Sequence, residues 1–168
     1  MKDTKSYLSK IVQDMPDSGI KDFFDVANTM EGALSLGVGE PDFPTPEHVR
    51  EAAIASIKKG DTKYTDNRGT VELRAAAADY LTKFDLHYDK QDAILITMGA
   101  SEGIDLALRT LVNPGEEVLV AEPSYVSYIP CIELCGGVPV SLKLRAENKF
   151  RLTREQLEEK ITEKSKVL

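Results

Sequence analysis

The sequence predicts an α/β fold in which a mostly parallel sheet carries helices on both faces. Three apolar runs, at 93–97, 118–121 and 138–142, are too short for helices and are predicted to be buried strands. Between them lie segments with apolar residues at helical spacing, at 100–111 and 126–134. Because strands that alternate with helices pair in parallel, this order predicts βαβ units.

The turn after the first predicted strand is the strongest candidate for a binding site. Gly99, Ala100 and Ser101 lead directly into a predicted helix. In a right-handed βαβ unit such a turn lies at the carboxyl end of the strand, where open α/β sheets bind ligands. The free N–H groups of Ala100 and Ser101, together with the helix dipole, would suit a phosphate group.

Three kinds of chemistry could use this turn. A dinucleotide site would place an acid such as Glu122 about 20 residues further on, but the G-x-G-x-x-G spacing is absent. A serine hydrolase is suggested by G-x-S-x-G at 99–103, yet His48 and His87 both precede Ser101, whereas that fold needs its histidine afterwards. The third possibility is a phosphate-bearing cofactor such as pyridoxal 5′-phosphate.

Composition and charge narrow the classes of partner. The chain has 168 residues, of which 42% are hydrophobic and 29% charged, and its net charge is −7. This acidity argues against nucleic acid and anionic membranes as partners, and no apolar run reaches the length of a membrane span. Cys131 and Cys135 lack a neighbouring Cys or His cluster, so we expect two reduced thiols and no metal site. The predicted location is cytoplasmic.

Three motifs occur in an order and spacing that resemble one family. They are LSLGVGEPDFPTP at 34–46, YTDNRGTVELRAAAADYL at 64–81 and ITMGASEGIDLALRTLVNPGEEVLVAEPSYVSY at 96–128. The chain resembles the amino-terminal part of class I/II aminotransferases, fold type I pyridoxal-phosphate enzymes that include the aspartate and aromatic aminotransferases. The resemblance implies the large domain of that fold. It also implies transfer of an amino group between an amino acid and a 2-oxo acid through pyridoxal 5′-phosphate.

The resemblance assigns expected roles to residues on the cofactor side. Gly99, Ala100 and Ser101 would hold the cofactor phosphate, and the ring of Tyr125 would stack on the pyridine ring. Tyr64 opens a complete Y-x-x-x-x-G motif, in which the family's tyrosine reaches the cofactor phosphate of the other subunit. A homodimer is therefore expected.

The resemblance also implies a substrate side and two domains. Gly39 would meet the substrate carboxylate through its N–H group, and Ile20 would border the substrate pocket. No catalytic residue is assigned, because the family's Schiff-base lysine lies downstream of the matched motifs. Residues 1–45 are expected to form an amino-terminal helical arm and a segment of the small domain. Residues 46–168 are expected to be the first part of the cofactor-binding large domain.

The carboxyl-terminal end predicts a helix and then a strand that is cut short. Residues 152–164 are predicted to form a helix with a capping box made by Thr153 and Gln156, and a new apolar run begins at 166–168. In the family, strands from later sequence lie between the strand expected at 93–97 and those at 118–121 and 138–142, so this chain alone would leave a gap in the sheet. A fragment of an aminotransferase is therefore the favoured hypothesis. The alternatives are a noncatalytic phosphate-binding α/β module and, less favoured, the G-x-S-x-G hydrolase.

Overall fold

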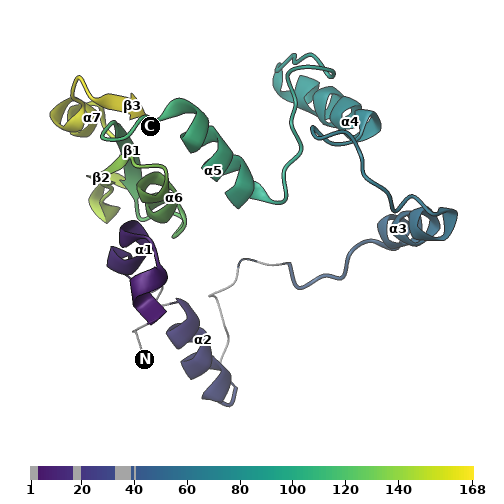
Figure 1. Ribbon diagram of the computed structural model, residues 1–168, viewed down its shortest axis with the longest axis horizontal. Helices are drawn as coiled ribbons and strands as arrows, with labels where there is room; N and C mark the ends of the chain where they lie inside the picture. The colour runs from purple at the N-terminus through teal and green to yellow at the C-terminus, as the bar shows by residue number, and fades with distance from the viewer. Residues whose placement is uncertain (1–3, 17–19, 33–38, 40) are drawn as a thin grey trace. The chain divides into compact units, whose positions relative to one another are not determined.

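A computed structural model describes residues 4–16, 20–32, 39 and 41–168. The chain divides into two compact units, one formed by Met1–Met15 with Leu95–Leu168 and the other by Pro16–Ile94. The first unit holds all three described strands (Figure 1). Among the described residues, no helix combines the length and apolar character that crossing a membrane requires.

In its described residues, the first unit contains two short 3-10 helices, four α-helices and a three-stranded sheet. Its helices are η1 (Thr4–Tyr7), α1 (Lys10–Asp14), α5 (Ala100–Leu111), α6 (Tyr128–Leu134) and α7 (Arg154–Lys160), with the 3-10 turn η3 (Ala146–Asn148). The strands are β1 (Glu117–Glu122), β2 (Val138–Lys143) and β3 (Ser165–Val167). They lie in the order β2-β1-β3, and both pairings are parallel. The predicted α/β class with a parallel sheet is confirmed.

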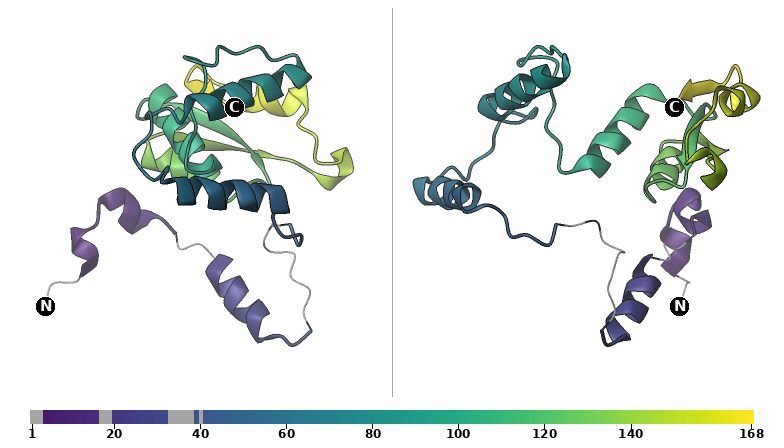
Figure 2. Two further views of the ribbon diagram at one scale, coloured as in Figure 1. Left: turned by 90° about the vertical axis from the view of Figure 1, so that its right-hand side faces the viewer. Right: turned by 180° about the vertical axis from the view of Figure 1, so that it is seen from behind.

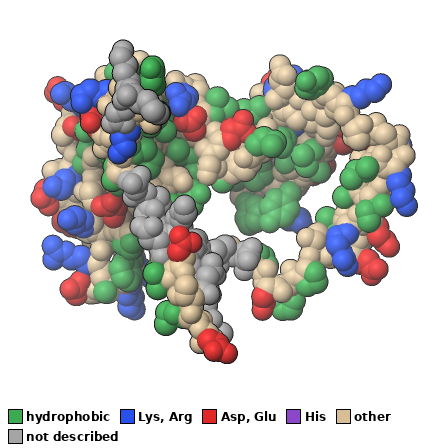
Figure 3. All heavy atoms as spheres, turned by 60° about the horizontal axis from the view of Figure 1, so that its bottom comes forward, with side chains coloured by type: hydrophobic (Ala, Val, Ile, Leu, Met, Phe, Trp, Pro, Cys, Tyr) green, Lys and Arg blue, Asp and Glu red, His purple; other side chains and the backbone are tan. Residues whose placement is uncertain are grey.

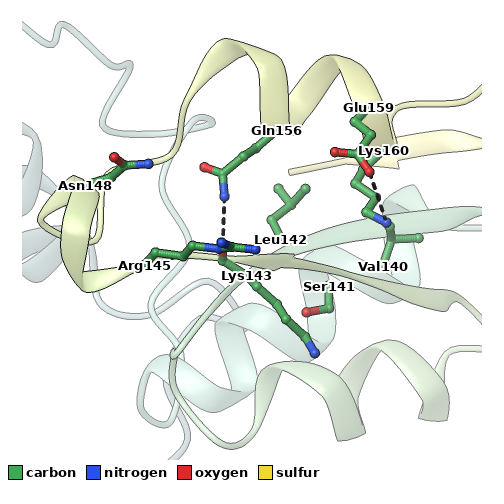
Figure 4. Close-up of a pocket in the computed structure, with 9 residues that line it drawn as sticks. All are labelled: Val140, Ser141, Leu142, Lys143, Arg145, Asn148, Gln156, Glu159 and Lys160. Carbon is green, nitrogen blue, oxygen red and sulfur yellow. Dashed lines mark hydrogen bonds and ion pairs between the residues drawn. The ribbon is translucent and has the colours of Figure 1, made fainter.

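Both faces of this sheet are covered. Val118, Leu119 and Val120 of the central strand are all buried, and successive strand residues point to opposite faces. Val118 and Val120 belong to a core that includes Leu108 of α5 and Ile132 of α6. On the other face α7 contacts β2, and Figure 4 shows α7 and α6 on opposite sides of this strand. The predicted arrangement of helices on both faces is therefore also confirmed.

The strand predicted over 93–97 is wrong. These residues are described, and none of them belongs to a strand. The run leads into α5, no described strand pairs with it, and Leu95 is 46% exposed. An apolar run becomes a strand only when another strand accepts its backbone hydrogen bonds, and sequence pattern alone carries no information about that partner. The parallel unit formed here is β1-α6-β2 rather than one built on 93–97.

Where it is described, the second unit consists of helices and loops. It contains α2 (Ile20–Thr29), α3 (Glu47–Lys59), α4 (Val71–Leu81) and the short 3-10 helix η2 (Thr82–Phe84), visible in the two views of Figure 2. The side chain of Thr70 caps α4 by accepting a hydrogen bond from the N–H of Leu73. On this helix Ala78 and Arg74 are buried. Figure 3 shows both acidic and basic side chains on the visible face.

Candidate functional site

The turn at Gly99 has a backbone that only glycine adopts readily. Its φ is 85° and its ψ is 167°, a combination essentially restricted to glycine. Two hydrogen bonds tie the turn to Thr97, which accepts from the Gly99 N–H at 2.9 Å and donates its hydroxyl to the Gly99 carbonyl at 2.9 Å. α5 begins at the next residue, Ala100. The turn is therefore a preformed entry to the helix.

The first N–H groups of α5 are available to a ligand. Within the described part of the chain, the N–H groups of Ala100 and Ser101 make no hydrogen bond, and the first one inside the helix runs from Gly103 to Gly99 at 3.5 Å. The carboxylate of Glu102 accepts a hydrogen bond from the N–H of Met98 on the same turn. The site thus offers two unpaired donors beside the positive end of the helix dipole.

Tyr125 lies beside this turn. It follows the carboxyl end of β1, and its hydroxyl is 3.2 Å from Oγ of Ser101. The ring is half-exposed and meets the Tyr128 ring edge-on, with centroids 5.7 Å apart and an interplanar angle of 79°. Hydrogen bonds to Ser101, then to Ser127, hold the pKa of the Tyr125 phenol below its usual value, because they stabilise the phenolate. The structure thus brings Gly99, Ala100, Ser101 and Tyr125 together.

The remaining predicted site residues belong to the other unit. Tyr64 is fully exposed at the start of its loop. Gly39 is exposed, and a Cβ added to it would meet nothing within 4 Å. Ile20 is the first residue of α2, and its side chain lies outside the described residues. The predicted roles of these three residues stay predictions.

The competing chemistries gain no support from the described residues. The side chain of Ser101 has Tyr125, not a histidine, as its hydrogen-bond partner, and His87 contacts Asp85. The carboxylate of Glu122, the candidate acid of a dinucleotide site, accepts a hydrogen bond from the Ser141 hydroxyl on the neighbouring strand. In the part of the chain that is described, no His, Cys, Asp and Glu residues group as metal ligands, and both cysteines are free.

A separate hollow lies between β2 and α7. Its volume is about 670 Å³, and its wall includes Arg145, Asn148 and Gln156 (Figure 4). Gln156 donates from Nε2 to the carbonyl oxygen of Lys143 at 2.8 Å across this hollow. None of the predicted site residues lines it, so it is distinct from the turn at Gly99.

Arg74 is a residue that the sequence pattern did not single out. Its side chain is buried, and it contacts the loop that carries Tyr64. The helix shows apolar periodicity around it, and an arginine within such a pattern is ordinarily predicted to be on the surface. Arg74 precedes Ala78 by four residues, so both lie on one face of α4, but only the structure shows that this face is buried.

Comparison with known proteins gives the family. The profile of the family described as aminotransferase class I and II matches residues 31–168. The Bacillus subtilis protein named "Putative aminotransferase YugH" is 48% identical over 164 residues, which cover 97% of this chain and 42% of that protein. The aromatic-amino-acid aminotransferase 2 of Thermococcus litoralis is 41% identical over 162 residues, covering 96% and 42% respectively.

Solved structures agree with the sequence comparison. The aspartate aminotransferase of Thermotoga maritima matches with a TM-score of 0.87 and 34% identity, over 95% of this chain and 44% of that chain. This chain therefore spans about two fifths of the length of the relatives that it matches. A profile match over most of the chain, together with these relatives, shows that the chain belongs to the class I and II aminotransferase family.

Proposed function

We propose that this chain supplies one side of a pyridoxal 5′-phosphate site in an aminotransferase. The reaction would transfer an amino group between an amino acid and a 2-oxo acid. Family membership supports the reaction class. The amino-terminal end of α5 supports the choice of cofactor, because its unpaired N–H groups can donate hydrogen bonds to a phosphate monoester.

The observation that carries the proposal is the contact between Ser101 and Tyr125. Their hydroxyl oxygens are 3.2 Å apart, which fixes an aromatic ring next to two unpaired helix N–H groups. A phosphate on those N–H groups would leave an attached pyridine ring within reach of the Tyr125 ring. A phosphate site needs only the donors, whereas a pyridoxal phosphate site needs the neighbouring aromatic face as well.

Each residue would then have a distinct task. Ala100 and Ser101 would donate hydrogen bonds to phosphate oxygens, and the Gly99 turn would let the backbone approach them closely. Tyr125 would stack on the pyridine ring and help to exclude water from it. When bound, the cofactor supplies an electron sink for the carbon from which a proton is removed.

Further parts of the proposal concern the second unit and the assembly. Tyr64 would contact the cofactor phosphate of a second copy in a homodimer, and its full exposure leaves it available for such a contact. Gly39 would donate its N–H to the substrate carboxylate, and Ile20 would border the substrate. We also propose residues 1–45 as arm and small-domain segment, 46–168 as part of the large domain, and the cytoplasm as the location.

Calorimetric titration of the protein with pyridoxal 5′-phosphate, and with pyridoxal lacking the phosphate, tests this proposal. Two hydrogen bonds to a charged acceptor are worth about 3 kcal/mol or more, so the phosphate should improve affinity at least about a hundredfold. Replacing Tyr125 by Leu should weaken binding of both compounds about fivefold, because stacking is worth about 1 kcal/mol. Tyr88→Leu, at an exposed tyrosine of the other unit, is the matched control.

Two results would contradict the proposal. Equal affinities for the two compounds would mean that no phosphate is bound at the α5 terminus. An effect of Tyr88→Leu as large as that of Tyr125→Leu would mean that the ring beside Ser101 has no special part in binding.

A further inference from the structure

Arg74 is the one charged side chain that is buried among the described residues. It lies on α4 and is 2% exposed. Burying a guanidinium group is costly unless its donors are paired, so its partners show what the burial achieves. All of them belong to the same unit of the chain, Pro16–Ile94.

The guanidinium joins two segments that are far apart in the sequence. Its Nε donates to the carbonyl oxygen of Gly69 at 3.2 Å. Its Nη1 donates to the carbonyl oxygens of Lys90, at 3.5 Å, and Gln91. Its Nη2 lies 3.9 Å from Oδ2 of Asp66. Arg74 therefore holds both the loop 64–69 and the segment 90–91 against α4.

Asp66 connects this arginine to the internal turn of the loop. Its Oδ1 accepts a hydrogen bond from the N–H of Arg68 at 2.8 Å, and its carbonyl oxygen accepts one from Gly69 at 2.9 Å. The Arg68 guanidinium also binds Asp92 at 2.8 Å, next to the segment that Arg74 contacts. The loop is thus closed at Gly69 and held at Asp66, while Tyr64 at its start remains fully exposed.

We propose that Arg74 is a positioning residue that holds the 64–69 loop so that Tyr64 is presented to the cofactor phosphate. Arg74 itself touches no cofactor; it acts through the loop. This inference rests on the proposed function, since that function gives the Tyr64 hydroxyl its contact. It adds a buried side chain, absent from the predicted site, on which that contact depends.

Arginine fits this role for a geometric reason. The planar guanidinium donates in several fixed directions at once, and here it reaches Gly69, Gln91 and Asp66 from one buried position. A lysine ammonium keeps the charge but is a single point of donation on a flexible stem, so it cannot bridge all three. Arg74→Lys should therefore loosen the loop while α4 stays helical.

Amide hydrogen exchange and cofactor titration test the inference together. Arg74→Lys should speed exchange of the Arg68 and Gly69 amides about tenfold, the effect of losing one hydrogen bond from a charged donor. It should weaken binding of pyridoxal 5′-phosphate several-fold. In a Tyr64→Phe background, Arg74→Lys should produce no further weakening, because the hydroxyl through which it acts is already gone.

Two further variants keep the test decisive. Arg50→Lys is the matched control, because among the described residues the exposed Arg50 side chain makes no hydrogen bond or ion pair. It should change neither exchange nor affinity. If Arg74→Lys does not fold, Asp66→Ala removes the carboxylate that faces Arg74 and should loosen the same amides.

The outcomes distinguish the positioning role of Arg74 from the proposed contact between Tyr64 and the cofactor. If Tyr64→Phe weakens binding but Arg74→Lys weakens it equally in both backgrounds, Arg74 is only structural and the inference is overturned. Unchanged exchange at Gly69 in Arg74→Lys also overturns it. If Tyr64→Phe leaves cofactor affinity unchanged, the Tyr64 contact in the proposed function is refuted, and the positioning role is refuted with it.

Discussion

Replacing Gly137 by Ala should lower the free energy of unfolding, whereas replacing Gly103 by Ala should raise it. Gly137 closes a Schellman motif at the end of α6, where its N–H donates to the Ile132 carbonyl at 2.9 Å. A Cβ there would lie 3.0 Å from Cγ2 of Ile132, 3.0 Å from Cγ1 of Val112 and 3.2 Å from the Ile132 oxygen. Both neighbours are buried, at 1% and 7% exposure, so neither has room to move.

The expected size follows from two opposing effects. Overpacking in Gly137→Ala costs about 1–3 kcal/mol and the lower entropy of the unfolded chain returns about 0.4–1 kcal/mol, so the midpoints of these ranges give a net loss of about 1.3 kcal/mol. Gly103 lies inside α5, and its added Cβ would meet only Thr97 at 3.4 Å, an ordinary contact. Gly103→Ala should therefore raise the free energy of unfolding by about 0.5–1 kcal/mol.

Urea denaturation followed by circular dichroism would measure both variants. The two glycines belong to the same unit, so one transition should report on both. Ile132→Leu removes the Cγ2 methyl that the new Cβ would meet, so it should partly rescue Gly137→Ala, with a coupling above about 0.5 kcal/mol. Equal effects of the two alanine substitutions would refute the packing argument.

Three smaller predictions concern single side chains. Ser101→Ala should raise the pKa of Tyr125, because the phenolate loses its main hydrogen-bond donor. The pH titration of tyrosinate absorbance, with Tyr125→Phe as the reference that lacks this phenol, should move to higher pH. Burial raises the pKa of Cys131, so iodoacetamide should alkylate Cys135 first. Mass spectrometry of the digested protein would measure the order, and alkylation of Cys131 first would contradict the prediction. Thr153→Ala should cost about 1 kcal/mol by removing a capping bond, which an unchanged melting temperature would contradict.

Features set by local chemistry could be predicted from the sequence. Strands β1 and β2 were expected at 118–121 and 138–142 and occur at Glu117–Glu122 and Val138–Lys143. Their connecting helix and the Thr153–Gln156 capping box are also confirmed. In each case a short apolar run or a capping pair carries the information within a few residues.

Features that depend on distant partners could not be predicted. The run 93–97 has the composition of a strand, but strand formation requires a neighbour, and none of the strands that the structure describes pairs with it. Arg74 is buried because carbonyl groups of Gly69 and Gln91 converge on it, and nothing in the sequence near Arg74 shows this.

In the candidate site, too, some features depend on local sequence and others on distant partners. The Gly99 turn and the helix after it were predicted from the sequence and are present, without the strand expected before them, and the phosphate-binding role of the turn stays a prediction. The approach of Tyr125 to Ser101 spans 24 positions; it was predicted because both residues were expected to follow strands of one sheet, of which only β1, before Tyr125, is formed. The roles of Tyr64, Gly39 and Ile20 concern the other unit and stay predictions.

The central claim is that a phosphate ester binds the N–H groups at the start of α5. Amide-resolved NMR of the protein, titrated with pyridoxal 5′-phosphate and separately with pyridoxal, tests it most directly. The phosphate compound alone should shift the amide resonances of Ala100 and Ser101 strongly. Unchanged resonances there, with the phosphate-dependent shifts gathered instead around Arg145 in the hollow beside α7, would contradict it.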